Sequence, residues 1–135
     1  MAPGKAALNR FATNFVTERH LATLSLPRDE GGIHVTPVGF TWDAEAGVAR
    51  VITWENAYKL RLVGDKCRAT ICQVDGRHWL SIEGTATVVS DQGRCVDAER
   101  RYTQRYQPPR RTGDGRRVIE ISVDRVIGSS EMHTT

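Results

Sequence analysis

The sequence lacks several features that would assign the protein to a membrane, secreted or metal-binding class. None of its apolar runs approaches the length that crosses a membrane, and residues 1–5 lack the apolar stretch of a secretory signal, so we expect a cytoplasmic protein with no membrane partner. Its three cysteines, Cys67, Cys72 and Cys95, are an odd number without a CxxC pair. That count argues against a disulfide framework and gives no metal-ligand spacing, so we expect reduced thiols and no metal site.

The sequence also lacks the motifs of the common hydrolases and phosphoryl-transfer enzymes. There is no GxSxG, HExxH or Walker sequence. The four histidines, His20, His34, His78 and His133, are scattered, and none has a ligand-like partner four residues away. The sequence therefore identifies no catalytic acid, base or nucleophile.

Acidic and basic residues are close to balance, with a net charge of +3, but arginine is concentrated between residues 100 and 117. Such a cluster favours either an anionic small molecule or nucleic acid, or it belongs to a solvated helix face and a polar loop. Zinc-finger spacing and an RNP-type sequence are both missing, so we expect no nucleic-acid partner.

The pattern of apolar residues and turn signals predicts a mainly β protein with a single domain over residues 1–135. Expected helices cover residues 8–17, 56–63 and 91–106, and expected strands cover residues 21–26, 33–42, 48–53, 69–74, 78–89 and 118–126. Gly64 is expected to end the second helix, Gly84 to mark a bulge or close approach, and Ser90 to cap the third helix. Six short strands joined by hairpins suggest a small antiparallel barrel, whose ligand site would lie outside it or at a dimer interface.

One local arrangement predicts an anion site. The strand over residues 49–53 runs into a short helix that carries Lys59, and Thr53 ends the strand. A helix N-terminus attracts phosphate, a lysine one turn in adds a charge, and Thr53 can donate its hydroxyl. The alternative is a solvated lysine and a capping threonine.

Trp79, beside the Asp75-Gly76 turn, either stacks on a planar ligand or belongs to the core or a dimer interface.

Six passages, in this order and at these separations, resemble the pyridoxamine-phosphate-oxidase-like split β-barrel family, in which the sequence is most similar to the deazaflavin (F-420)-dependent reductase branch. They are RHLATL (19–24), VGFTWD (38–43), ARVIT (49–53), CQVDGRHWLSIEG (72–84), DAERRYTQRYQPPR (97–110) and RVIEISVDRVIGS (117–129).

The resemblance implies a six-stranded split barrel (FMN-binding-like) that works as a homodimer with cofactor sites at the interface. It implies that Thr53 and Lys59 hold the cofactor phosphate, that Arg50, Val51 and Ile52 flank the ring, and that Trp79 lies near it. It further implies hydride transfer from reduced F-420 to a conjugated acceptor, biliverdin to bilirubin being the expected case, a reaction for which no acid–base pair is needed. Arg50 and Arg110 are then candidates to bind the substrate's carboxylates.

The sequence departs from the FMN-binding members of this family at several positions. Val35 and Phe40 stand where those enzymes carry cations, Tyr58 precedes Lys59 in place of an arginine, and Ala57 stands where several deazaflavin relatives have arginine. These departures favour F-420 over FMN. An FMN-dependent oxidoreductase of the same fold and a non-catalytic F-420- or flavin-binding protein remain as alternatives.

Overall fold

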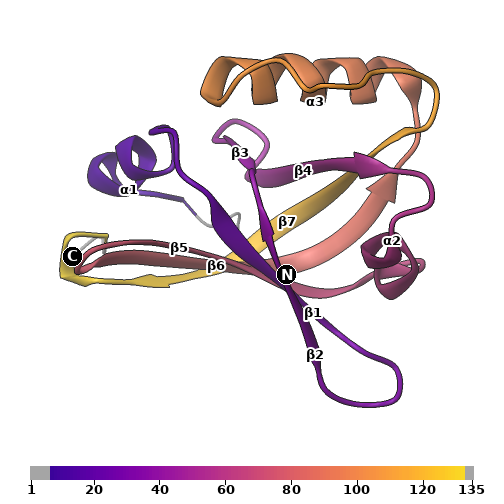
Figure 1. The fold of residues 1–135 in the computed structure, drawn as a ribbon. Helices are drawn as coiled ribbons and strands as arrows, with labels where there is room; N and C mark the ends of the chain where they lie inside the picture. The colour runs from indigo at the N-terminus through magenta and orange to yellow at the C-terminus, as the bar shows by residue number, and fades with distance from the viewer. Residues whose placement is uncertain (1–6, 133–135) are drawn as a thin grey trace.

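The computed structural model describes residues 7–132, which form a mainly β structure with three α-helices (Figure 1). The helices are α1 (Arg10–Phe15), α2 (Tyr58–Val63) and α3 (Gln92–Arg105), followed near the C-terminus by a short 3-10 helix, η1 (Ser130–Met132). The strands are β1 (Ala22–Pro27), β2 (Ile33–Val38), β3 (Thr41–Asp43), β4 (Val48–Trp54), β5 (Cys67–Asp75), β6 (His78–Val89) and β7 (Arg116–Gly128).

The strands form a single antiparallel sheet whose two edges are brought together by the chain itself. The strand order is β2-β1-β5-β6-β7-β4-β3, so β2 and β3 are at opposite edges. Only residues 39–40 join these two strands, and two residues span well under 10 Å. The sheet must therefore curl until its edges meet, an arrangement consistent with a split barrel.

The prediction of one strand over residues 33–42, and with it the prediction of six strands, is wrong. At Gly39 the backbone passes against two tyrosine rings of α3 and its C-cap, and a Cβ there would lie 3.1 Å from Tyr102 and from Tyr106. The Phe40 N–H then donates to the Tyr106 hydroxyl (3.1 Å), and the Phe40 carbonyl accepts from Arg105 (2.6 Å). These side chains satisfy the backbone that a continuous strand would have paired, so the chain leaves one edge and joins the other.

The interior of the curled sheet is filled by alternate residues of its strands. The largest fully buried apolar side chains are Phe40, Leu24, Leu26, Ile71, Leu80, Ile82, Ile119 and Ile121. Outside the curl, α3 covers β4 and β7 (Figure 1), where Cys95 and Ala98 of the helix pack with Val89, Val118 and Ile52. The interior is thus occupied by side chains, and space for a ligand has to lie outside it.

The other element predictions differ from the structure mainly at their ends. The register shifts between Glu83 and Gly84, where a Cβ on Gly84 would lie 2.0 Å from the Ser122 carbonyl oxygen, so the bulge and the close approach are both confirmed. Gly64 ends α2 with a φ of 56°, as predicted. The N-cap of α3 is Asp91 rather than Ser90, because the Asp91 carboxylate accepts the Arg94 N–H (2.9 Å).

Four further sequence observations concern single residues and functional classes. The three cysteines are free, with Cys95 buried, and His133 lies outside the described residues. Within residues 7–132 no group of histidine, cysteine, aspartate and glutamate side chains could hold a metal ion. In the same part of the chain no helix is both long and apolar enough to span a bilayer.

Part of the outer sheet surface carries exposed apolar side chains, and we call it the open face. On antiparallel strands, directly paired residues point to the same side, and the pairs Thr23–Pro37, Thr23–Cys72 and Val74–Trp79 place β2, β1, β5 and the start of β6 on one surface. Its large or exposed apolar residues are Leu21, Ile33, Val35, Pro37, Val74 and Trp79.

Candidate functional site

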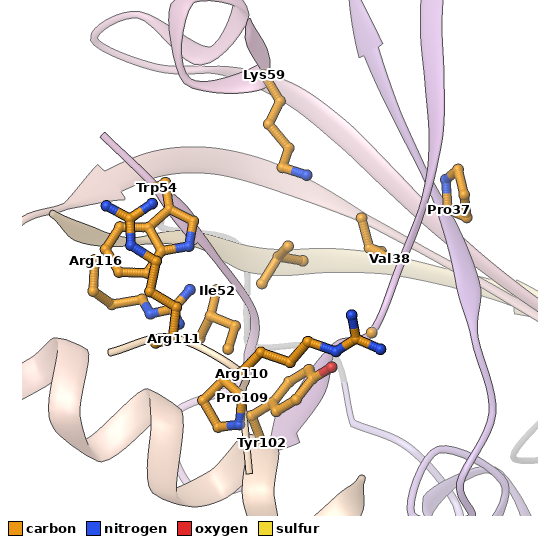
Figure 2. Close-up of a pocket in the computed structure, with 12 residues that line it drawn as sticks. Pro37, Val38, Ile52, Trp54, Lys59, Tyr102, Pro109, Arg110, Arg111 and Arg116 are labelled. Atoms are coloured by element: carbon orange, nitrogen blue, oxygen red, sulfur yellow. The ribbon is translucent and has the colours of Figure 1, made fainter. Parts of the chain in front are cut away.

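A cleft of about 340 Å³ lies outside the curled sheet, between the end of β2, the end of β4, α2 and the loop that follows α3 (Figure 2). Its apolar and aromatic lining comes from Pro37, Val38, Val51, Ile52, Trp54, Tyr102 and Pro109. Its volume is within the range of small-molecule sites, roughly 300–1,000 Å³. A planar ligand could lie between these side chains.

The polar lining of the cleft is cationic. Lys59, Arg110, Arg111 and Arg116 line it, and none of the described lining residues is acidic. Arg116 is buried and paired with Glu99 (2.6 Å), but Lys59, Arg110 and Arg111 have no carboxylate within salt-bridge distance in the part of the chain described. Three cations without a protein counter-ion around one cleft are an arrangement that attracts an anionic ligand.

Lys59 extends from α2 into the cleft (Figure 2). The side chain is partly buried, and this burial lowers the pKa of its ammonium group because the charged form loses hydration. A bound anion would restore favourable surroundings for the charge. Local sequence explains its placement: Ala57 provides an extended N-cap residue without a capping side chain, and α2 begins directly after it.

The two exposed arginines come from the loop between α3 and β7. Tyr106 caps α3, and Pro108 and Pro109, which cannot continue a helix, lead the chain across the mouth of the cleft to Arg110 and Arg111. The Arg111 guanidinium carbon lies 4.0 Å from the centre of the Trp54 ring. Arg110 and Tyr102 lie together on the side of the cleft that faces Lys59 (Figure 2).

Arg50, predicted from the sequence to bind cofactor and substrate, lies in an ion-pair network and does not line the cleft. Its guanidinium donates to Asp43 (2.9 Å) and Glu120 (3.1 Å), and its side chain is only 15% exposed. Burial acts to raise the pKa of Asp43, but hydrogen bonds from Arg50 and from the Ala46 N–H outweigh it and hold that pKa below its usual value. The Arg50 guanidinium is thus bound by two carboxylates of the protein itself.

The structure brings together four of the residues predicted for the site: Val51, Ile52, Lys59 and Arg110 all line the cleft. Thr53 is adjacent but buried, with its carbonyl accepting from Arg116 (3.2 Å). Trp79 lies at the β5–β6 hairpin, where its backbone N–H donates to the Ser129 hydroxyl (3.2 Å). The nine residues of β5 separate that hairpin from α2, roughly 26 Å of extended chain, so Trp79 and Lys59 of one chain do not share a site.

Eight lining residues were not predicted for the site: Pro37, Val38, Gly39, Trp54, Tyr102, Pro109, Arg111 and Arg116. Tyr102 is half-buried on α3, and its side chain also lines the cleft. Trp54 follows Thr53 directly, and Arg111 follows Arg110. Arg111 also belongs to the arginine cluster between residues 100 and 117, which was a signal for an anionic ligand, whereas the only signal for Trp54 was its proximity in sequence to Thr53.

Comparison with known proteins gives concordant results over nearly the whole chain. Residues 8–129 match the pyridoxamine 5'-phosphate oxidase family. The chain is 45% identical over 121 residues to an F420H(2)-dependent biliverdin reductase of Mycobacterium tuberculosis (strain CDC 1551 / Oshkosh), covering 90% of this chain and 88% of that protein.

Solved structures show the same fold at low sequence identity. A conserved hypothetical protein from Mycobacterium tuberculosis superposes with a TM-score of 0.77 at 18% identity, covering 95% of this chain and 87% of the other. An F420 reductase superposes with a TM-score of 0.67 at 19% identity, covering 84% of this chain and 94% of the other. Together with the match over residues 8–129, these findings confirm the resemblance seen in the sequence: the chain belongs to the pyridoxamine 5'-phosphate oxidase family.

Proposed function

We propose that the protein is an F-420-dependent reductase whose cofactor binds in the cleft between α2 and the loop after α3. The observation that carries this proposal is a group of cations, Lys59, Arg110 and Arg111, that have no carboxylate partner among residues 7–132 and surround a cleft with no acidic lining from the same residues. The 45% identity to an F420H(2)-dependent biliverdin reductase supports F-420 as the anionic cofactor.

The residues present fit such a cofactor. Lys59 supplies a point charge suited to phosphate, and Val38, Ile52 and Pro109 supply flat apolar surface suited to a ring system. Tyr102 adds an aromatic face. The chain's role in the reaction is therefore to bind and orient the cofactor and to match its charge.

Biliverdin is the substrate that we propose, with bilirubin as the product. When bound, reduced F-420 would supply the hydride that reduces the central methine bridge of the acceptor, and a proton from water would complete the two-electron reduction. This chemistry requires orientation rather than an acid–base pair, in keeping with a cleft to which residues 7–132 contribute no histidine, aspartate or glutamate. We propose Arg110, at the exposed rim, as a partner for a substrate carboxylate.

The direct test is oxidation of reduced F-420 by the purified protein, with biliverdin, menadione and a nitroaromatic compound offered in parallel. We expect biliverdin to cause oxidation of the coenzyme, which is measured as the return of the coenzyme's visible absorbance. Bilirubin should form at the same time. Binding of F-420 without turnover of any acceptor would favour the non-catalytic alternative. Tighter binding of FMN than of F-420 in calorimetry would favour the FMN-dependent alternative.

We further propose that the protein is a homodimer formed through the open face. Ile33, Val35 and Val74 are 60%, 56% and 54% exposed there, and contiguous apolar surface of this kind marks protein interfaces. Pro37 lines both a shallow groove on this face and the cleft, so a partner docked on the face would border the cofactor site. If a Trp79 side chain approaches the cofactor ring, it would therefore come from the second copy of the chain.

Light scattering on surface variants tests the dimer. Val74→Asp places a charge in the proposed interface and should give monomers at micromolar concentration. The matched control is Val96→Asp, because Val96 on α3 is 63% exposed and does not belong to the open face. Dimers that survive Val74→Asp, or that are lost with Val96→Asp, would contradict this interface.

A cytoplasmic location and a single domain stay predictions.

A further inference from the structure

We propose that Arg111 is a second anion-binding group of the cleft, which binds an oxyanion of the cofactor, and that Trp54 is the positioning residue that holds it there. The identity of the ligand as F-420 rests on the proposed function. The assignment of Arg111 and Trp54 rests on their own contacts.

The first observation is how the Arg111 side chain is held. Its guanidinium carbon lies 4.0 Å from the centre of the Trp54 ring, at stacking distance, although the residue is exposed and has no carboxylate partner among residues 7–132. A stacked guanidinium keeps its N–H groups at its edge, where two of them can donate to one phosphate or carboxylate group. Trp54 thus holds the cation through a cation–π contact and leaves its donors available.

The second observation is that the backbone on both sides of this contact is fixed. Arg116, buried and paired with Glu99 (2.6 Å), donates to the Arg111 carbonyl (2.6 Å) and itself lies 4.4 Å from the Trp54 ring centre. At the other end of the same segment, the Gly115 carbonyl accepts from the Glu55 N–H (2.8 Å). A Cβ on Gly115 would lie 3.0 Å from the Trp54 ring. The residues from 111 to 115 are therefore tied to the ring, so Arg111 is oriented before any ligand binds.

The third observation is the distribution of charge around the cleft. On α2, position 57 is alanine and only Lys59 lines the cleft, whereas Arg61 is exposed and does not. The loop after α3 contributes cations on the other side (Figure 2). An anionic cofactor would then be bound from two walls, by an ammonium group on one and a prealigned guanidinium on the other, and preorganisation of the second reduces the entropy lost on binding.

The test measures the dissociation constant of F-420 by calorimetry for the full chain and its variants. Arg111→Ala should weaken binding by about tenfold to a hundredfold, the effect of a hydrogen bond to a charged group. Arg61→Ala is the matched control, because Arg61 is an exposed cation of α2 that does not line the cleft, and its loss should change affinity by less than about twofold. Equal affinity of Arg111→Ala and Arg61→Ala for F-420 would overturn the proposal.

A double-mutant cycle tests the positioning role of Trp54. Trp54→Ala alone should weaken F-420 binding about two- to fivefold, which corresponds to loss of one cation–π contact, and Trp54→Phe should lose less. In the Arg111→Ala background the Trp54→Ala change should cause no further loss, because there is no guanidinium left to position. If Trp54→Ala weakens binding equally in both backgrounds, the indole acts on the ligand directly or through the fold, and the positioning role is wrong.

Two further titrations separate this proposal from the proposed function. If the wild-type protein does not bind F-420, the proposed function fails, and inorganic phosphate followed by NMR chemical shifts then tests Arg111 by itself. Weaker phosphate binding by Arg111→Ala than by Arg61→Ala would support the anion site, and equal binding would overturn it. If Arg111→Ala weakens the binding of biliverdin but not of F-420, the assignment to the cofactor's oxyanion is wrong while the proposed function stands.

Discussion

Two clusters of basic residues lie near the same strand, β4, and they differ in whether their charges are paired. In the first, which we call the Arg50 network, each arginine contacts carboxylates: Arg50 lies 2.9 Å from Asp43 and 3.1 Å from Glu120, Arg94 lies 2.8 Å from Glu120, and Arg101 lies 2.9 Å from Asp97. In the second, the cleft, Lys59, Arg110 and Arg111 have no such partner among the described residues.

This difference separates cations that hold the fold together from cations that are available to a ligand. A half-buried guanidinium with fixed carboxylates already has its donors used, and removing it leaves buried negative charge behind. A cation without a counter-ion adds little to stability, and can contribute to binding. Both Arg50 and Lys59 looked like ligand-binding residues in the sequence. Substitutions in the two clusters should now affect different quantities.

The largest effect should be on the stability of an Arg50→Ala variant. The substitution removes two charge-assisted hydrogen bonds, to Asp43 and Glu120, whose side chains are only 11% and 19% exposed. Glu120 keeps Arg94 at 2.8 Å and Asp43 keeps Arg101 at 3.5 Å, so we expect the free energy of unfolding to fall by about 3 kcal/mol, the loss of two such bonds. Urea denaturation measures this change, and F-420 affinity should stay within about twofold of wild type. The control is Arg100→Ala, which breaks an exposed pair with Asp97 and should cost less than about 1 kcal/mol. Retained stability with lost affinity would instead place Arg50 at the ligand.

Lys59→Ala should show the opposite behaviour. We expect F-420 affinity to fall about tenfold to a hundredfold, because one charge-assisted contact is lost, while the unfolding free energy changes by less than about 0.5 kcal/mol. Steady-state kinetics should show the loss in the cofactor's KM, with kcat at saturation largely kept, because a phosphate contact remote from the transferred hydride changes little during the reaction. Lys59→Arg should be partly tolerated. An unchanged KM for Lys59→Ala would contradict the phosphate contact.

The smallest effect should be the dependence of binding on alkaline pH. Burial lowers the pKa of Lys59 in the free protein, and only the protonated form attracts an anion. The affinity for F-420 should therefore be full below that lowered pKa and decrease above it, by less than the loss caused by Lys59→Ala. Lys59→Arg, whose guanidinium stays charged, should lack this decrease, and comparison of the two proteins cancels titration of the ligand itself. If the wild-type protein and Lys59→Arg show parallel pH profiles, Lys59 does not determine the pH dependence of F-420 affinity.

Much of the fold was predictable because local signals and the hydrophobic pattern agreed. The Gly84 bulge, the end of α2 at Gly64 and the antiparallel hairpins each have a local cause that the sequence displays. The break between β2 and β3 does not. It depends on Tyr106 and Arg105, which are more than 60 residues away in sequence and satisfy the backbone of Phe40.

The candidate site was predictable only in part, because some of its residues are brought together by contacts between segments far apart in the sequence. Val51, Ile52 and Lys59 come from one strand–helix segment, so their proximity follows from the local chain. Arg110 was placed by the family resemblance, and Arg111 and Trp54 meet only because the loop after α3 returns to β4. Arg50 carries the same charge as the cleft residues, and only its contacts with Asp43 and Glu120 show that it is paired.

The most direct test of the difference between the Arg50 network and the cations of the cleft is a crystal structure of the protein with F-420 bound. Our account predicts the cofactor in the cleft, with an oxyanion within hydrogen-bond distance of Lys59, and with Arg50 still paired to Asp43 and Glu120. A cofactor bound elsewhere, or one that takes Arg50 away from its carboxylates while Lys59 stays in solvent, would contradict it.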